Sequence, residues 1–275
     1  MIKQAVKFCI RHAIGLTSGP TVRVVAGPLR GRKLLRQHGL PNLSMLFGTY
    51  ESRFAQAFGS RLSNHSTIYD IGANTGYFSL FAAHHSPAEA LVFSFEPVPE
   101  IASDLQAMVA VNGLQRRIRS FELALSDTTG QVRMFTPGSE ATGVIETALR
   151  GQQHSSDGSI NVETTTLDDF VLRQGHPAPE LIKLDVEGAE ASVLAGARQV
   201  LSDVRPTILL EVHGCEPAAD VWQVMQPLGY EFRLLTEQGE TVIRGQDAWL
   251  RHFAGSRWVI QHVVLAPAER MEAAA

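Results

Sequence analysis

The chain has 275 residues, of which 44% are apolar and 19% are charged, values typical of one globular α/β domain with an appendage. Its formal net charge of -4 argues against a nucleic-acid-binding protein, which usually carries a basic domain. Two cysteines are too few for a disulfide framework and no apolar run reaches the length of a membrane span, so we expect a cytoplasmic protein.

The N-terminal part reads as a lead-in. Residues 1–17 place apolar side chains at helical spacing and basic side chains on another face, which predicts an amphipathic helix. Such a helix can dock on the main domain, which we favour, or lie on an anionic membrane surface. Residues 27–31 have turn composition and are expected between two short strands. We therefore divide the chain into a lead-in, 1–48, and a main domain, 49–275.

The main domain is organised around residues 67–81. A β-favouring run is followed by a turn with Gly72 and Gly76 and then by an apolar helix, the opening unit of nucleotide-binding α/β sheets. The spacing Asp70-x-Gly72-x-x-x-Gly76 differs from the Gly-x-Gly-x-x-Gly of dinucleotide enzymes. A carboxylate at Asp70 would repel a pyrophosphate, but it suits an ammonium group such as that of S-adenosylmethionine.

Glu96 follows the second apolar run, 91–95, about twenty residues beyond the glycine loop. An acid at this place accepts hydrogen bonds from the ribose hydroxyls of a bound nucleotide. The alternative is that Glu96 only caps a helix that starts at 97–99. We favour ribose binding, because the glycine loop and the acid at the strand end occur in the expected order.

The rest of the chain alternates between strand and helix patterns. We predict strands at 118–125, 131–135, 160–166, 181–185, 207–212, 230–235 and 258–265, and helices at 52–62, 100–111, 189–201 and 218–225. The segment 137–159 is long for a loop, which is typical either of a lid or of a segment without function. Alternating strands and helices predict a mostly parallel sheet covered on both faces. Ligands bind such sheets at the carboxyl ends of the strands, which would bring Asp70, Glu96, Ser126, Asp185 and His213 together.

Several motifs occur in an order that resembles the FkbM-type methyltransferases. They are Asp-Ile-Gly-Ala-Asn-Thr-Gly-Tyr-Phe-Ser (70–79), Phe-Glu-Pro (95–97), Val-Asn-Gly-Leu (111–114), Lys-Leu-Asp-Val-Glu-Gly-Ala-Glu (183–190), Val-Leu-Ala-Gly-Ala (193–197) and Glu-Val-His (211–213). The resemblance covers about 49–264. It implies a class I methyltransferase fold, with a Rossmann-like sheet of seven mostly parallel strands whose last strand is antiparallel. It also implies S-adenosylmethionine as methyl donor and O-methylation of a sugar or polyketide-like small molecule.

The resemblance also implies a cofactor site. Carried over position by position, it assigns the methionine half of the cofactor to Asp70, Gly72, Asn74, Gly76 and Tyr77. It assigns the ribose hydroxyls to Glu96 and the adenine to Ala124, Leu125 and Ser126. Asp185 should face the reacting methyl group.

An aliphatic hydroxyl is a reluctant acid, so we expect a base or a metal ion at the site. His213 is the first candidate base and Glu187 the second. Alternatively, Asp185, Glu187 and Glu211 could hold a divalent cation such as Mg²⁺. Three of these residues also have a structural interpretation: Glu187 can stabilise a helix start, Glu211 can pair with Lys183 or Arg205, and His213 can bond to the backbone.

Two other functions fit the pattern less well. An NAD-dependent oxidoreductase has a similar sheet, but Asp70 and the glycine spacing speak against it. A catalytically idle domain that binds the cofactor, or an assembly partner, is the third interpretation. The expected partner is a small hydroxylated acceptor, with no nucleic acid and with 1–17 as the candidate segment for peripheral membrane contact.

Overall fold

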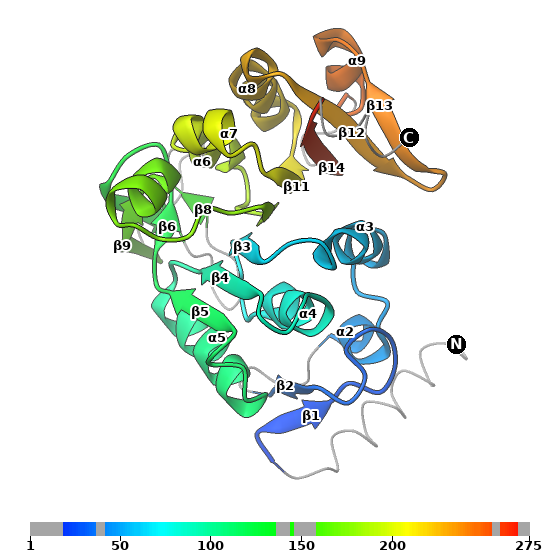
Figure 1. Cartoon of the computed structure of the whole chain (residues 1–275), viewed down its shortest axis with the longest axis vertical. Coiled ribbons are helices and arrows are strands. Elements are labelled where there is room, and N and C mark those ends of the chain that lie inside the picture. Colours follow the sequence, from blue (N-terminus) through cyan, green and yellow to red (C-terminus); the bar gives the residue numbers. More distant parts are fainter. Residues whose placement is uncertain (1–18, 37–41, 136–143, 146–157, 255–258, 269–275) are drawn as a thin grey trace.

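The computed structural model describes residues 19–36, 42–135, 144–145, 158–254 and 259–268. Its main feature is an eight-stranded sheet with the strand order β13, β12, β14, β11, β10, β3, β4, β5 (Figure 1). These strands are β3 (Thr67–Ile71), β4 (Leu91–Phe95), β5 (Ile118–Phe121), β10 (Leu181–Leu184), β11 (Thr207–His213), β12 (Tyr230–Thr236), β13 (Gly239–Ile243) and β14 (Ile260–Pro267). β14 is antiparallel to both of its neighbours, whereas β5, β4, β3, β10 and β11 are parallel. The mostly parallel sheet with an antiparallel last strand is confirmed.

The expected number of seven strands is wrong by one. The eighth strand, β13, forms a hairpin with β12, in which Thr236 pairs with Gly239. Three of the five β13 residues are exposed, so the segment lacks the apolar run that would have identified it as a strand. The short helix α9 (Gln246–Arg251) was not predicted either.

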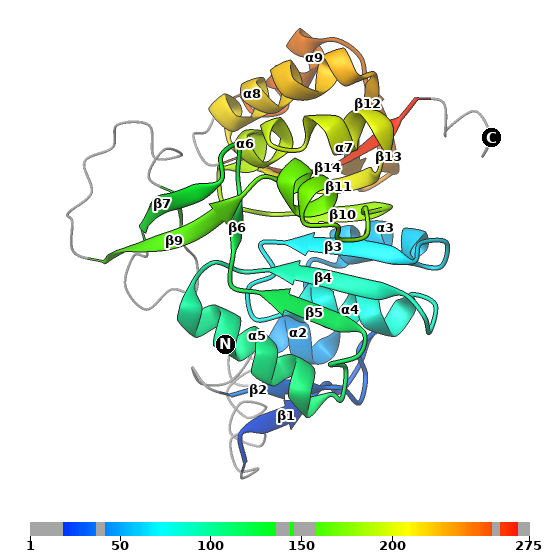
Figure 2. The ribbon, with the colours of Figure 1, turned by 60° about the vertical axis from the view of Figure 1, so that its left-hand side comes forward.

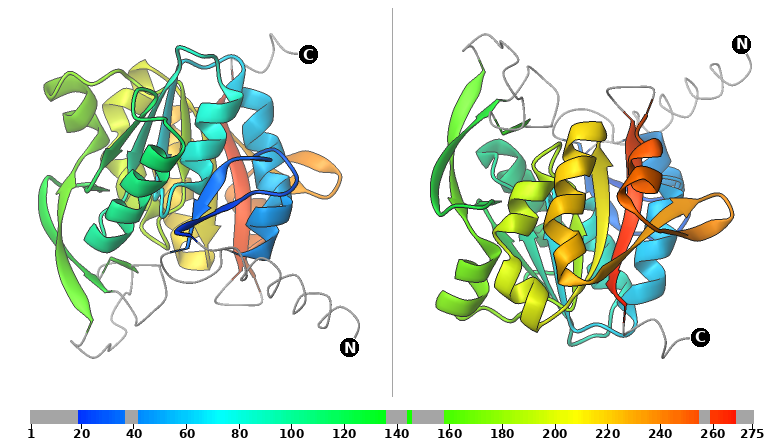
Figure 3. Two further views of the ribbon diagram at one scale, coloured as in Figure 1. Left: turned by 90° about the horizontal axis from the view of Figure 1, so that it is seen from below. Right: turned by 90° about the horizontal axis from the view of Figure 1, so that it is seen from above.

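Helices cover both faces of the sheet, as predicted. One face packs against α6 (Glu190–Ala195), α7 (Arg198–Asp203), α8 (Cys215–Met225) and α9, and the other against α2 (Leu43–Phe47), α3 (Ser52–Leu62), α4 (Tyr77–His85) and α5 (Pro99–Val111) (Figure 3). Neighbouring residues of a strand point to opposite faces. In β3, Ile68 accordingly joins the core on the α3–α5 side and Tyr69 the core on the α6–α9 side.

A second, four-stranded sheet lies beside the main one, in the order β6, β9, β7, β8 (Figure 2). Its strands are β6 (Ala124–Leu125), β7 (Gly130–Phe135), β8 (Val144–Ile145) and β9 (Ser159–Thr165), so the two extra strands expected near 131–135 and 160–166 are confirmed. The single strand predicted at 118–125 is wrong. Its first half pairs with β4 as β5, whereas its second half leaves the main sheet and pairs with β9 as β6.

The helix predicted over 189–201 is interrupted between α6 and α7. Gly196 lies at the break, and a Cβ atom there would approach the carbonyl oxygen of Ser126 to 2.0 Å. The absence of a Cβ atom at Gly196 therefore lets the chain pass close to Ser126, the residue that follows β6.

The described part of the lead-in packs on the main domain. The strands β1 (Thr21–Arg23) and β2 (Lys33–Leu35) form a hairpin around the predicted turn at 27–31. The Asn112 side chain, which ends α5, accepts a hydrogen bond from the Lys33 N–H and donates one to the Lys33 carbonyl, at 3.0 and 2.9 Å. Leu29 and Leu34 are buried in the same core as α3 and α4.

Two predictions concern segments outside this description. The amphipathic helix at 1–17 lies outside the described residues, and of the loop 137–159 only β8 and residues 158–159 are described. Among the helices that the structure does describe, none has both the length and the hydropathy needed to cross a membrane.

Candidate active site

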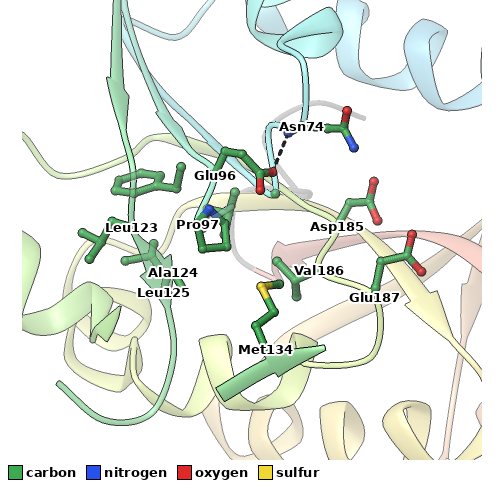
Figure 4. A pocket seen from close by; sticks show the side chains of 13 residues that line it. Asn74, Glu96, Pro97, Leu123, Ala124, Leu125, Met134, Asp185, Val186 and Glu187 are labelled. Carbon is green, nitrogen blue, oxygen red and sulfur yellow. Dashed lines mark hydrogen bonds between the residues drawn. The ribbon is translucent and has the colours of Figure 1, made fainter. Parts of the chain in front are cut away.

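A pocket opens at the carboxyl ends of β3, β4 and β10 (Figure 4). Five of the predicted cofactor residues line it: Gly72, Asn74, Glu96, Ala124 and Leu125. The pocket thus lies at the edge of the parallel sheet where ligands are expected to bind.

The glycine loop approaches the backbone after β10 very closely. Gly72 has a φ of +74°, and a Cβ atom at this position would lie 1.7 Å from the carbonyl oxygen of Asp185. The loop is held from the other side by Phe95, whose carbonyl accepts hydrogen bonds from the N–H groups of Gly72 and Ala73 at 3.0 and 2.9 Å. Only glycine fits between these two backbone segments.

Glu96 is buried, with 6% of its surface exposed, and both of its carboxylate oxygens are held by backbone N–H groups. Oε2 accepts from Asn74 and Oε1 from Val98, each at 3.0 Å. Burial raises the pKa of Glu96 to about 7, although these hydrogen bonds oppose the shift. Val98 is the residue that precedes α5, so the helix-capping contact exists, and the same carboxylate also borders the pocket.

Asp70 lies behind the glycine loop and does not line the pocket. It is fully buried, and its Oδ2 accepts a hydrogen bond from the Ser79 hydroxyl at 2.6 Å. Lys183 Nζ lies 3.4 Å from Asp70 Oδ1 and 3.4 Å from Asp185 Oδ2, and it donates to the Gly72 carbonyl at 2.8 Å. Lys183 thus ties the strand ends of β3 and β10 together, a contact that the sequence analysis missed.

Gly76, Tyr77 and Ser126 also lie outside the pocket wall. A Cβ atom on Gly76 would meet the Leu105 side chain at 2.5 Å, so this glycine permits α4 to pack against α5. The Tyr77 ring packs edge-on against Tyr50, with 4.9 Å between the ring centroids. Ser126 is buried at the end of β6.

The predicted catalytic residues gather beside the pocket around His213. Its Nδ1 lies 2.7 Å from Glu190 Oε1, and its Nε2 lies 3.2, 3.5 and 3.8 Å from carboxylate oxygens of Glu211, Glu187 and Asp185. Burial lowers the pKa of His213, but the hydrogen bonds with Glu190 and Glu211 outweigh it and raise the pKa to about 11. An imidazolium has no free lone pair, so His213 in this state cannot accept the proton of a hydroxyl.

Glu211 lies between two histidines. Its Oε2 is 2.8 Å from His262 Nε2 and its Oε1 is 3.2 Å from His213 Nε2, so these ion pairs join it to two histidines rather than to the Lys183 or Arg205 of the structural alternative. Burial opposes the charge of Glu211, yet these two partners lower its pKa to about 2.

Asp185 and Glu187 connect this cluster to the pocket, because both line its wall (Figure 4). Burial raises the pKa of both carboxyl groups, against the opposing charges of Lys183 and His213. The Glu187 side chain is 41% exposed, which makes it the more accessible of the two.

Two groups of three side chains have the donor atoms and the spacing of a metal site. They are Asp185, Glu211 and His213, and Glu51, Glu211 and His262; within each group the donor atoms lie within 4.8 Å of one another. The structure therefore brings together two of the three predicted metal candidates, with His213 in the place of Glu187. The three other residues of this cluster, Glu51, Glu190 and His262, were not predicted from the sequence to belong to the site.

The strand order and the pocket at the carboxyl edge define a class I methyltransferase fold. Residues 70–232 match the methyltransferase FkbM domain, and the chain belongs to this family. The 2-O-methyltransferase NoeI of Sinorhizobium fredii is 35% identical over 150 residues, which are 50% of this chain and 60% of NoeI. The 31-O-demethyl-FK506 methyltransferase FkbM of Streptomyces tacrolimicus is 28% identical over 216 residues, 69% of this chain and 78% of that protein. Among solved structures, the methyltransferase FkbM from Methylobacillus flagellatus shares 18% identity over 74% of this chain and 44% of its own, with a TM-score of 0.47.

Proposed function

We propose that the chain transfers a methyl group from S-adenosylmethionine to a hydroxyl of a sugar or natural-product-type small molecule. The observation that carries the proposal is the continuity of the pocket from Gly72 and Glu96 to the acidic edge at Asp185 and Glu187. The names of the relatives support the reaction type, since they include a 2-O-methyltransferase, a 31-O-demethyl-FK506 methyltransferase and the hexuronic acid methyltransferase AglP of Haloferax volcanii.

The pocket residues fit the parts of S-adenosylmethionine. Glu96 has lone pairs left for ribose hydroxyls after its two backbone contacts. Leu125 and Met134 offer an apolar wall to adenine. Gly72 and Asn74 line the part of the pocket assigned to the methionine half, and Asp70 supports that loop from behind rather than contacting the ligand.

The bound donor carries its methyl group on a sulfonium, so the residues of the chain mainly have to align the acceptor. Such alignment is worth roughly 7–11 kcal/mol. The bond between the acceptor oxygen and the methyl carbon forms while the carbon–sulfur bond breaks, and the hydroxyl proton must leave. We assign its removal to Glu187, because this carboxylate lines the pocket and is exposed enough to reach an acceptor, whereas both ring nitrogens of His213 already face carboxylates.

We further infer that Asp185, Glu211 and His213 hold a divalent cation, which would replace the proton on His213 Nε2 when it binds. A bound cation would polarise the acceptor hydroxyl and favour its deprotonation. Two carboxylates and an imidazole suit the donor preferences of Mn²⁺ better than those of Mg²⁺, which prefers oxygen ligands alone. Glu190 holds His213 Nδ1, as carboxylates commonly do behind metal-binding histidines, and so directs Nε2 toward the site.

Calorimetric titration with S-adenosylmethionine and, separately, with NAD tests the cofactor. We expect only S-adenosylmethionine to bind, and Gly72→Arg and Glu96→Ala to abolish binding. Glu163→Ala, an exposed residue of β9, is the matched control. Transfer of a labelled methyl group to a panel of sugars and polyketides then tests the reaction. Binding of NAD alone would overturn the proposal, and cofactor binding without transfer to any acceptor, unchanged in Asp185→Asn, would support the idle domain instead.

A further inference from the structure

The carboxylate of Glu211 has a different histidine at each of its oxygens. His213 comes from the same strand, β11, and His262 from β14. We propose that Glu211 bridges two divalent cations: one is held with Asp185 and His213, as inferred above, and a second with Glu51 and His262. This proposal depends on the proposed function in one respect only, because the second cation shares Glu211 with the first.

The three ligands of the second site come from parts of the chain that are far apart in the sequence. Glu211 and His262 are directly opposite each other in the antiparallel pair of β11 and β14. Glu51 comes from the turn before α3, where it has a φ of +40°. One donor atom from each residue lies within 4.8 Å of the other two. Ligand bonds of about 2.0–2.2 Å place donors somewhat closer together than this limit, so small side-chain rotations are enough to enclose an ion.

The two groups are suited to neighbouring cations because they share one carboxylate. In two-metal sites the ions lie about 3.5–4 Å apart. Glu211 offers one oxygen toward each histidine, at 3.2 and 2.8 Å, and a carboxylate that bridges two ions uses its oxygens in this way.

The charge of the cluster calls for cations. Carboxylates gather at this edge of the sheet from five residues: Glu51, Asp185, Glu187, Glu190 and Glu211. Their cationic partners among the described residues are the two histidines and Lys183, which also pairs with Asp70. Five carboxyl groups therefore face three cationic side chains, one of which is shared with Asp70.

A buried oxygen in the cluster supports the same conclusion. Glu190 is fully buried and faces His213, yet its Oε2 has no hydrogen-bond partner in the described part of the chain. Its other oxygen, Oε1, accepts from the Gly188 N–H and contacts His213. A buried carboxylate oxygen without a hydrogen-bond partner is costly, and a cation held by the neighbouring His213 would offset part of that cost once the imidazole has lost its proton.

Both histidines are oriented so that Nε2 faces Glu211. Glu190 fixes His213 from its Nδ1 side at 2.7 Å. The His262 ring packs against the Phe54 ring, with 5.1 Å between the ring centroids. The donor atoms are thus directed toward the shared carboxylate before any ligand binds, which lowers the cost of organising the site.

Manganese binding tests the inference without any methyl acceptor. The protein is titrated with Mn²⁺, bound metal is measured after equilibrium dialysis, and the paramagnetic resonance spectrum reports whether the ions interact magnetically. We expect two Mn²⁺ per chain with the spectrum of a coupled pair. His262→Gln, which keeps a donor toward Glu211, and Glu51→Gln should each leave one uncoupled ion. Glu211→Ala should weaken both ions at least tenfold.

The control is His252→Ala, an exposed histidine beyond α9, which should retain two ions. A single Mn²⁺ that His262→Gln does not affect would overturn the second site and leave the proposed methyl transfer intact. Failure to bind any Mn²⁺ would overturn both cation positions, and Glu211 would then be a carboxylate paired with two histidines. Failure of S-adenosylmethionine to bind, with two Mn²⁺ present, would instead refute the proposed function alone.

Discussion

Replacing Gly72 by alanine should destabilise the protein and abolish cofactor binding, because this position has two independent requirements for glycine. Its φ of +74° is left-handed, and its Cα lies against the Asp185 carbonyl, where a Cβ atom would be 1.7 Å away. A left-handed residue with a Cβ atom costs about 1–2 kcal/mol. Forcing an extra carbon into a packed site costs about 1–3 kcal/mol more.

Two other glycines separate these requirements. Gly175 has a φ of +76°, and a Cβ atom added there would meet nothing within 4 Å, so Gly175→Ala carries the backbone cost alone. Gly196 has an ordinary φ of -79°, but its Cβ would lie 2.0 Å from the Ser126 carbonyl, so Gly196→Ala carries the collision alone.

Thermal unfolding, followed by circular dichroism, measures the three variants side by side. In a chain of this size, 1 kcal/mol shifts Tm by about 2–4 °C. We expect Tm to fall by about 2–8 °C in Gly175→Ala, by about 2–12 °C in Gly196→Ala, and by roughly the sum of the two in Gly72→Ala. Titration should show normal cofactor affinity in Gly175→Ala and none in Gly72→Ala. If Gly72→Ala were no less stable than Gly175→Ala and still bound the cofactor, the close approach of the two backbones would not be what requires glycine here.

Three further outcomes can be checked. Burial raises the pKa of Glu96 from 4.5 to about 7, so the folded state holds the proton of this carboxyl group more tightly than the unfolded state does. The protonated Glu96 therefore adds to the free energy of unfolding at low pH. This contribution should be lost as the pH rises from 4.5 to 7, by about 3 kcal/mol in total. Cofactor affinity should move the opposite way and fall below pH 7, where the carboxyl is protonated; titrations at pH 6 and 8 measure this, and a flat profile would rule out the ribose contact. Asn112→Ala should lower Tm by several degrees, because it removes two hydrogen bonds to the lead-in of about 1 kcal/mol each. The control Asn64→Ala, at an exposed loop position, should leave Tm unchanged. Equal melting curves for the two variants would show that Asn112 does not anchor the lead-in. Membrane contact through residues 1–17, the alternative to docking on the main domain, predicts that deleting them reduces co-sedimentation with acidic liposomes, and unchanged co-sedimentation would exclude this contact.

Local patterns were enough to predict the elements that form the proposed cofactor pocket. The strands at 67–71 and 91–95 have the predicted bounds, because each is a short apolar run that ends at a turn. Glu96 was found for the same reason, since its place depends on the end of one strand. The placement of Asp70 behind the loop could not be predicted, because it depends on a hydrogen bond from Ser79 and an ion pair with Lys183.

Long-range pairing explains what the sequence did not reveal. The run at 118–125 is divided between two sheets because its second half pairs with β9, about forty residues later in the chain. Glu51 and His262 lie close together only because β14 lies between β11 and β12. No local sequence pattern predicts that strand order. His262 could have been suspected from its alternation within an apolar strand, and Glu51 from the Gly-Thr-Tyr-Glu segment that precedes α3.

The position of β14 in the middle of the sheet has a consequence for synthesis of the protein. The walls of the pocket come from residues 71–187, so they can assemble on the nascent chain while later residues are still being translated. β11 and β12 are not hydrogen-bonded to each other, because β14 lies between them. His262 can therefore reach Glu211 only after β14 has been translated and has paired with β11. A chain that ended before residue 260 would therefore lack part of its acidic cluster, and it would leave the facing edges of β11 and β12 unpaired and open to other proteins.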